Sequence, residues 1–330
     1  MPLGTPDDFT CFRPSVTGGL LFFSDISNQI GGDIMSTQTV SASSQKNVSL
    51  ITLREKKERG EPIVSLTAYD YPTALAADSA GLDLILVGDS LGMTVLGYET
   101  TLRVTMAEML HHCRAVARGV QRALLTGDMP FLSYQADVAD AVRNAGKFLS
   151  EAGMDSVKLE GGSEMASTVS AIVSAGIPVM GHIGLTPQSV HQLGGYLAQG
   201  RKSDSARELL DDALALERAG CFAIVLESVP ARVATLISER IDVPTIGIGA
   251  GAGCDGQVLV SHDLLGISDR SVPRFVKQYA GLGMEMLEAF KQYSAEVRQR
   301  EFPASEHTFT IPDNEWKVFL DGLEDAPSGG

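Results

Sequence analysis

The sequence is short of cysteine and of basic charge, and it contains no long hydrophobic run. Its 330 residues include four cysteines, which stand far apart at positions 11, 113, 221 and 254 without a CxxC pair. This spacing argues against a zinc cage or a disulfide framework and fits a reducing compartment, so we expect a cytoplasmic protein. No apolar stretch approaches the roughly 20 residues that a membrane span needs, so no membrane association is expected.

Basic residues are outnumbered by acidic ones, 26 to 41, which gives a formal net charge of −15. Nucleic acids and anionic membranes are bound by clusters of Lys and Arg, and no basic run occurs anywhere in the chain. Apolar residues make up 44% and charged residues 20%, as in ordinary globular proteins. We therefore expect small-molecule substrates and exclude nucleic acid as a partner.

The chain divides into a folded middle and two flanking segments. Residues 1–47 are rich in Ser, Thr and Gly and lack periodicity, which predicts a disordered N-terminal extension, with Met35 as an alternative start of translation. Residues 48–310 carry the regular patterns of a catalytic domain. After Pro303 the sequence turns polar, and residues 311–330 are predicted to be a C-terminal tail.

Short apolar runs alternate with helical patterns through the middle of the chain. The runs are continuously apolar, as expected of parallel strands that are covered on both faces. They occupy 63–68, 84–89, 123–128, 156–161, 177–182, 222–227 and 243–250. The helical pattern at 105–120 begins with a capping box of Thr105 and Glu108, and those at 137–153 and 206–220 end at Gly153 and Gly220.

This alternation predicts an α/β protein with a parallel sheet. Seven placed strands and a folded length near the ~250 residues of a typical (β/α)8 TIM barrel favour that fold, although the pattern does not place the eighth strand. A doubly wound open sheet is the alternative.

Four of the apolar runs end in a carboxylate, at Asp89, Asp128, Glu160 and Glu227. In a parallel barrel the carboxyl ends of the strands share one rim, where catalytic groups stand. Carboxylates that gather there repel one another, and Mg²⁺ resolves the conflict because it prefers oxygen ligands. Any one of them alone also fits a helix N-cap or a solvated loop residue.

Two further residues are placed to join such a site. Lys158 precedes Glu160 by two residues, so both side chains point to the same face of a strand. Lys158 suits an anionic substrate, although a structural ion pair is the alternative. His182 ends its strand and is expected to line the pocket, with either a positioning role or a role in proton transfer.

The motifs that surround these residues resemble the ketopantoate hydroxymethyltransferase family. They run in order from about residue 48 to 309, as "TAYDY", "VGDSLGMTVLGYETTLRVT", "DMPF", "VKLEGG", "GHIGLTPQSVHQLGGY", "LESVP" and "IGIGAG…DGQVLV…D". The resemblance implies a (β/α)8 barrel enzyme that transfers a one-carbon unit from 5,10-methylenetetrahydrofolate to 3-methyl-2-oxobutanoate. The products would be 2-dehydropantoate and tetrahydrofolate, in pantothenate biosynthesis.

The resemblance also implies the site residues and the assembly. It assigns Mg²⁺ binding to Asp89, Asp128 and Glu160, the last either directly or through water, and substrate contacts to Asp89, Ser90, Asp128 and Lys158. Glu227 falls on the proton acceptor that converts the 2-oxo acid into an enolate, with Mg²⁺ as the Lewis acid. A ring-like homo-oligomer, commonly a homodecamer, is expected.

Two other functions fit some of these residues. A Mg²⁺-dependent C–C lyase or phosphomutase acting on a pyruvate-like acid would use similar enolate chemistry. A catalytically dead barrel kept as an oligomeric scaffold is of a different class, and the intact acids argue against it.

Overall fold

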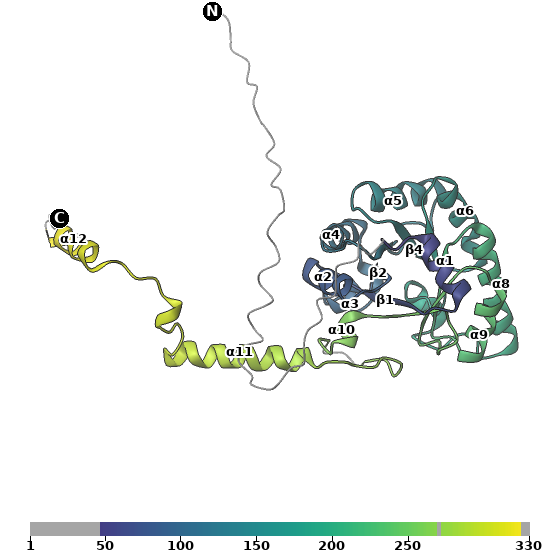
Figure 1. Ribbon diagram of the computed structural model, residues 1–330. Coiled ribbons are helices and arrows are strands. Elements are labelled where there is room, and N and C mark those ends of the chain that lie inside the picture. Colours follow the sequence, from purple (N-terminus) through teal and green to yellow (C-terminus); the bar gives the residue numbers. More distant parts are fainter. Residues whose placement is uncertain (1–46, 269–271, 325–330) are drawn as a thin grey trace, which may run out of the picture. The chain divides into compact units, whose positions relative to one another are not determined.

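The computed structural model describes residues 47–268 and 272–324 of the chain. Eight parallel strands close into a barrel in which each strand pairs with the next and β8 pairs with β1 (Figure 1). The predicted (β/α)8 barrel is confirmed, and the doubly wound alternative is wrong. The strands are β1 (Ile63–Thr67), β2 (Leu84–Val87), β3 (Leu124–Asp128), β4 (Ser156–Glu160), β5 (Val179–Gly184), β6 (Ala223–Glu227), β7 (Thr245–Ile248) and β8 (Gly256–Leu259).

The strand that the sequence pattern did not place is β8. It is only four residues long and follows β7 without an intervening helix. It begins with Gly256 and the exposed Gln257, so it lacks the continuous apolar run by which the other strands were predicted. Its pairing with both β7 and β1 completes the barrel.

Helices follow most strands and cover the outside of the barrel (Figure 1). The α-helices are α1 (Leu50–Arg59), α2 (Tyr71–Ser79), α3 (Leu91–Thr94), α4 (Met106–Ala117), α5 (Val138–Ser150), α6 (Ala166–Ser174), α7 (Val190–Leu193), α8 (Ser203–Ala219), α9 (Ala231–Arg240), α10 (Ser261–Leu264), α11 (Leu282–Gln299) and α12 (Asp313–Glu324). Short 3₁₀ turns are η2 (Thr101–Arg103), η3 (Ser163–Met165), η4 (Pro187–Ser189) and η5 (Ser305–His307).

Two of the three predicted helix ends agree with the structure. The Thr105 hydroxyl accepts from the Glu108 N–H and the Glu108 carboxylate accepts from the Thr105 N–H, which forms the predicted capping box of α4. Gly220 ends α8 with a φ of 100°. The prediction for Gly153 is wrong, because α5 already ends at Ser150 and Gly153 takes its positive φ in the turn that follows.

Helix α1 closes the end of the barrel that lies opposite the carboxyl ends of the strands. Leu53 is fully buried in the cluster of apolar side chains inside the barrel. Lys57 Nζ donates to the carbonyl oxygens of Ser238 and Val243 and pairs with Asp255 at 2.9 Å, all of which precede strands β7 and β8. The open end of the barrel is therefore the rim where the strands finish.

Val48 is the first buried residue in the described part of the chain, and the predicted domain boundaries stay predictions. The predicted extension lies, apart from its last residue, outside the described residues, as do Cys11 and Met35. The predicted C-terminal tail contains α12. Within the described residues, no helix has both the length and the apolarity to cross a membrane.

Candidate active site

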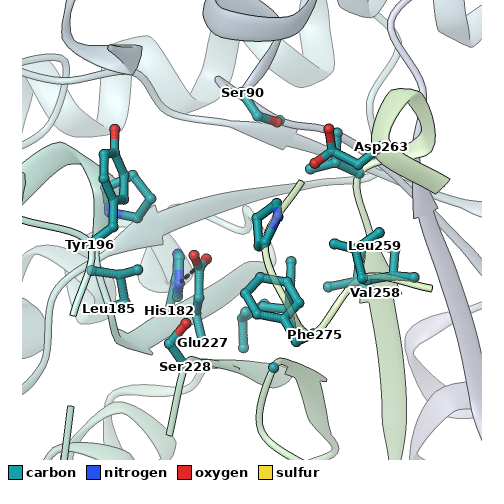
Figure 2. A pocket seen from close by; sticks show the side chains of 18 of the residues that line it. Ser90, His182, Leu185, Tyr196, Glu227, Ser228, Val258, Leu259, Asp263 and Phe275 are labelled. Carbon is teal, nitrogen blue, oxygen red and sulfur yellow. Dashed lines mark ion pairs between the residues drawn. The ribbon is translucent and has the colours of Figure 1, made fainter. Parts of the chain in front are cut away.

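The four predicted acids lie at one end of the barrel. Asp128, Glu160 and Glu227 are the last residues of β3, β4 and β6, and Asp89 follows β2 by two residues. All four line one cavity of about 1650 Å³, and the Glu227 carboxylate points into it (Figure 2). The expectation that acids from separate strands meet at the carboxyl rim is therefore met by the geometry, whereas their chemical roles stay predictions.

Asp89 and Asp128 are direct neighbours. The backbone N–H of Asp89 donates to Asp128 Oδ2 at 3.2 Å, and both residues are buried. Burial raises the pKa of Asp89 well above its usual value, and the charges of Asp128 and Glu160 raise it further. Burial also raises the pKa of Asp128, against the opposing effect of Lys158. The two carboxylates therefore repel each other when both are ionised, and a bound cation would relieve this repulsion.

Lys158 brings a buried positive charge to the acids. Its Nζ lies 3.0 Å from Asp128 Oδ1, an ion-pair distance without hydrogen-bond alignment. Burial alone would lower the pKa of Lys158, but the carboxylates of Asp128, Glu160 and Asp89 raise it above its usual value. The ion pair that the sequence left as an alternative exists, and Lys158 also lines the cavity, so it remains available to an anionic ligand.

His182 lies between Glu160 and Glu227. Its Nδ1 is 3.5 Å from Glu160 Oε1 and its Nε2 is 3.3 Å from Glu227 Oε2 (Figure 2). Burial and Lys158 lower the pKa of His182, but the two carboxylates outweigh them and raise it to about 9. The pKa of Glu160 falls below its usual value because His182 and Lys158 overcome the effect of burial. Lys158 Nζ also lies 3.2 Å from Nδ1, so the ring is held among two carboxylates and an ammonium group, which favours the positioning role for His182.

Ser90 stands on the cavity wall beside Asp89 (Figure 2). Its Oγ shares a hydrogen bond of 2.8 Å with the hydroxyl of Tyr69. Burial raises the pKa of Tyr69 to about 12, so this phenol stays protonated at neutral pH. The pair therefore places two hydroxyl groups next to the acids.

Gln188 is a residue of the site that the sequence analysis did not single out. Its side-chain N–H groups donate to Asp89 Oδ2 at 2.9 Å and to the Met129 carbonyl at 3.0 Å. Its carbonyl oxygen accepts from the Tyr134 hydroxyl at 2.8 Å, and its backbone N–H donates to Glu160 Oε2 at 2.9 Å. Gln188 thus fixes two acids at once. Its signal in the sequence was its place in the motif "GHIGLTPQSVHQLGGY", in the loop that follows a strand.

The acids fit a magnesium ion that keeps some of its own water. Mg²⁺ usually takes one or two carboxylates together with waters and substrate oxygens. Across 47–268 and 272–324, no group of three or more His, Cys, Asp or Glu side chains is arranged as a preformed metal cage. Asp128 Oδ1 is buried, lies 3.0 Å from Lys158 Nζ and is aligned with no hydrogen-bond donor in those segments, so the charge that it pairs with is that of an ammonium group, which a metal ion could displace. Both carboxylate oxygens of Glu160 already have partners, because Oε2 accepts from the Gln188 N–H and Oε1 lies 3.5 Å from His182 Nδ1. This arrangement suits a contact with Mg²⁺ through a water molecule.

Replacing Gln188 by leucine is expected to weaken Mg²⁺ binding by about 10- to 100-fold, the usual cost of losing a residue that orients a metal ligand. The change leaves the Asp89 carboxylate without its donor. Isothermal titration with Mg²⁺, or electron paramagnetic resonance with Mn²⁺, measures the affinity. Gln135→Leu is the matched control, because the Gln135 side chain bonds Gln188 and, among the bonds found, no acid. Equal affinity in wild type and Gln188→Leu would contradict this role.

The fold and the cavity define a (β/α)8 barrel enzyme with an acidic site at its carboxyl rim. Solved structures of similar fold include a phosphonopyruvate hydrolase in complex with oxalate and Mg++ (TM-score 0.51, 15% identity, covering 83% of this chain and 95% of that chain). Another is a phosphoenolpyruvate phosphomutase from Streptomyces platensis subsp. rosaceus (TM-score 0.52, 15% identity, 84% and 96%). At such identity the likeness shows the fold alone.

Sequence similarity identifies the family. The family model described as ketopantoate hydroxymethyltransferase matches residues 47–305. Two relatives named 3-methyl-2-oxobutanoate hydroxymethyltransferase come from Carboxydothermus hydrogenoformans (58% identity, covering 80% of this chain and 96% of the relative) and Thermoanaerobacter sp. strain X514 (55%, 83% and 100%). The chain therefore belongs to the ketopantoate hydroxymethyltransferase family and is an enzyme of the transferase class, which confirms the resemblance of its motifs.

Proposed function

We propose that the protein transfers the one-carbon unit of 5,10-methylenetetrahydrofolate to 3-methyl-2-oxobutanoate, giving 2-dehydropantoate and tetrahydrofolate in pantothenate biosynthesis. The observation that carries this proposal is the family membership, because relatives at 55–58% identity bear the name of this reaction. The geometry of the cavity supports it, since Asp89, Asp128, Lys158 and Glu227 line one space at the barrel rim.

The acidic half of the cavity would hold the 2-oxo acid. Asp89 and Asp128, with Glu160 through water, would hold Mg²⁺, which supplies a Lewis acid for the keto group when bound. Lys158 neutralises the negative charge that the substrate brings and that develops during the reaction. The Ser90 hydroxyl donates a hydrogen bond to the substrate carboxylate.

Glu227 accepts the proton from C3 of the 2-oxo acid. It stands on the opposite side of His182 from Glu160, and its carboxylate faces the cavity (Figure 2). A general base must reach within about 3 Å of the proton that it removes. His182 keeps the Glu227 carboxylate oriented. The methylene carbon then exchanges both of its bonds to folate nitrogens for a bond to the carbanionic C3 and a bond to the oxygen of a water molecule. The two nitrogens of the tetrahydrofolate gain two protons, one that Glu227 took from C3 and one that the water releases.

The rival functions have less support. A C–C lyase or phosphomutase would share the fold of the structural neighbours, but their 15% identity carries no argument about chemistry. A dead scaffold would tolerate the loss of Asp89, Asp128, Lys158, Glu160 and Glu227, and all five are present.

The expected location and assembly also belong to the proposal. We expect a cytoplasmic enzyme that forms a ring-like homo-oligomer, commonly a homodecamer. Helix α11 supports an assembly, because none of its described residues is buried and Met284, Phe290 and Tyr293 are more than half exposed, at 65%, 64% and 57%. Apolar surface of this kind is normally covered by another protein surface.

A direct assay tests the proposed reaction. Purified protein with both substrates and Mg²⁺ is expected to form 2-dehydropantoate, detected by mass spectrometry, and a chelator is expected to stop the reaction until Mg²⁺ is restored. Omission of the folate is the control. Absence of product under these conditions, with turnover of a pyruvate-like acid instead, would favour the lyase or phosphomutase.

A further inference from the structure

The cavity is larger than a five-carbon acid requires. Its volume of about 1650 Å³ exceeds the ~300–1,000 Å³ that normally holds a single drug-sized ligand. Beyond the acids, the wall is formed by the end of β8, by α10 and by the segment that precedes α11. Val258, Leu259, Asp263 and Phe275 line this second part of the cavity, which we call the β8 side (Figure 2).

Asp263 is a half-buried carboxylate on the β8 side. It forms neither a hydrogen bond through its side chain nor an ion pair with residues 47–268 or 272–324. Burial raises its pKa, as expected of a carboxylate that lacks donors. Among its neighbours, the pKa of His262 is lowered by burial, so its ring is neutral, and the Tyr69 phenol against which that ring packs is engaged with Ser90. The carboxylate is therefore free to accept hydrogen bonds from a ligand.

Phe275 gives the β8 side a flat apolar surface. Its ring lies against Gly249, where a Cβ atom would come within 2.7 Å of the ring. Gly249 also has a φ of 64°, a left-handed conformation that side-chain-bearing residues rarely adopt. Glycine at this position lets the Phe275 ring approach the backbone that follows β7. Phe275, together with Val258 and Leu259, gives this part of the cavity an apolar lining that suits an aromatic or heteroaromatic ring.

Two exposed arginines also line the cavity, Arg201 after α7 and Arg274 next to Phe275. Their exposure places them where the cavity opens to solvent. The cavity therefore offers a half-buried acceptor, an apolar wall and exposed cations. A ligand that fits it has N–H donors at one end, a ring system in the middle and anionic groups at the other end.

We propose that the β8 side binds the reduced folate and that Asp263 accepts the 2-amino and N3–H groups of its pterin ring. This assignment rests on the proposed function, which supplies the folate. The two N–H groups lie side by side on the pterin edge, so they can pair with a carboxylate as a guanidinium does. Phe275 packs against the ring system, and Arg201 and Arg274 pair with the glutamyl carboxylates.

The test compares Asp263→Asn with Glu99→Gln. The asparagine keeps the size of the side chain but presents one acceptor instead of two and no charge. The variant loses hydrogen bonds that a charged carboxylate accepts. Its affinity for tetrahydrofolate should therefore fall by about 10- to 150-fold in a calorimetric titration. Glu99 also lines the cavity but is exposed, and its variant should bind tetrahydrofolate like wild type.

A second measurement separates the two halves of the cavity. Deuterium exchange at C3 of 3-methyl-2-oxobutanoate needs no folate, so Asp263→Asn should exchange within about twofold of wild type while its KM for methylenetetrahydrofolate rises. Unchanged folate affinity, an equal loss in Glu99→Gln, or a parallel loss of C3 exchange would overturn the assignment of Asp263. If wild type itself fails to bind tetrahydrofolate, the proposed donor is wrong as well.

Discussion

Glu227→Gln is expected to slow deuterium exchange at C3 of 3-methyl-2-oxobutanoate by on the order of 10²–10⁴, the range for loss of a general base. Glutamine keeps the shape of the side chain but cannot accept the proton. Because Glu227 ends β6 and makes no contact with Asp89 or Asp128 among the interactions found, binding of Mg²⁺ and of the 2-oxo acid should persist. Proton nuclear magnetic resonance in deuterated water follows the exchange, and calorimetry measures the binding.

This experiment also decides between the two interpretations of His182. If the ring only positions Glu227, exchange slows to the predicted extent in Glu227→Gln although His182 is intact. Exchange at the wild-type rate in the variant would show that another group removes the proton. His182 is the nearest candidate, because its Nε2 lies 3.3 Å from Glu227 Oε2. Loss of substrate binding together with exchange would instead indicate that Glu227 helps to hold the 2-oxo acid.

The sequence predicts the barrel and the meeting of the acids because both follow from local patterns. Continuous apolar runs mark buried parallel strands, and residues that end such strands share a rim. Asp128 and Glu160 could therefore be placed near each other before any tertiary contact was known. Strand β8 escapes this reasoning because its four residues include a glycine and a glutamine and form no continuous apolar run.

Gln188 and Asp263 could not be predicted, because their roles depend on contacts between distant segments. Gln188 reaches Asp89 across 99 positions of the sequence, and an isolated amide in a loop carries no sign of this. The environment of Asp263 depends on Phe275, which belongs to a segment that follows the last strand. Helix propensity, strand pattern and capping signals contain no information about such pairs.

The backbone around Glu227 is a further feature that only the structure reveals. A Cβ atom at Gly184 would lie 2.3 Å from the Glu227 carbonyl oxygen, so only glycine lets the end of β5 approach β6 so closely. Ser228, which follows Glu227, has a φ of 52°, which is uncommon for a residue with a side chain. The turn that presents Glu227 to the cavity is thus locally strained, as is frequent at functional sites.

Asp89→Asn is expected to change metal affinity and protein stability in opposite directions. The variant loses a carboxylate ligand, so Mg²⁺-dependent binding of the 2-oxo acid should weaken by more than the ~10- to 100-fold typical of residues that only orient a ligand. The metal-free protein should become more stable at neutral pH, because a buried charge next to Asp128 and Glu160 is removed. The asparagine oxygen can still accept from Gln188.

Asp128→Asn provides the contrast, since the same change removes the partner of buried Lys158. Leaving one member of a buried ion pair unpaired costs up to about 3–5 kcal/mol, so this variant should lose both Mg²⁺ affinity and stability. Thermal unfolding with and without Mg²⁺ distinguishes the two variants.

The stability gained by Asp89→Asn should shrink as the pH falls, because wild-type Asp89 then becomes protonated itself. Equal destabilisation of the two metal-free variants would mean that the contacts of Asp89 stabilise the fold more than the repulsion from its acidic neighbours destabilises it. The electrostatic argument for a cation between Asp89 and Asp128 would then be wrong.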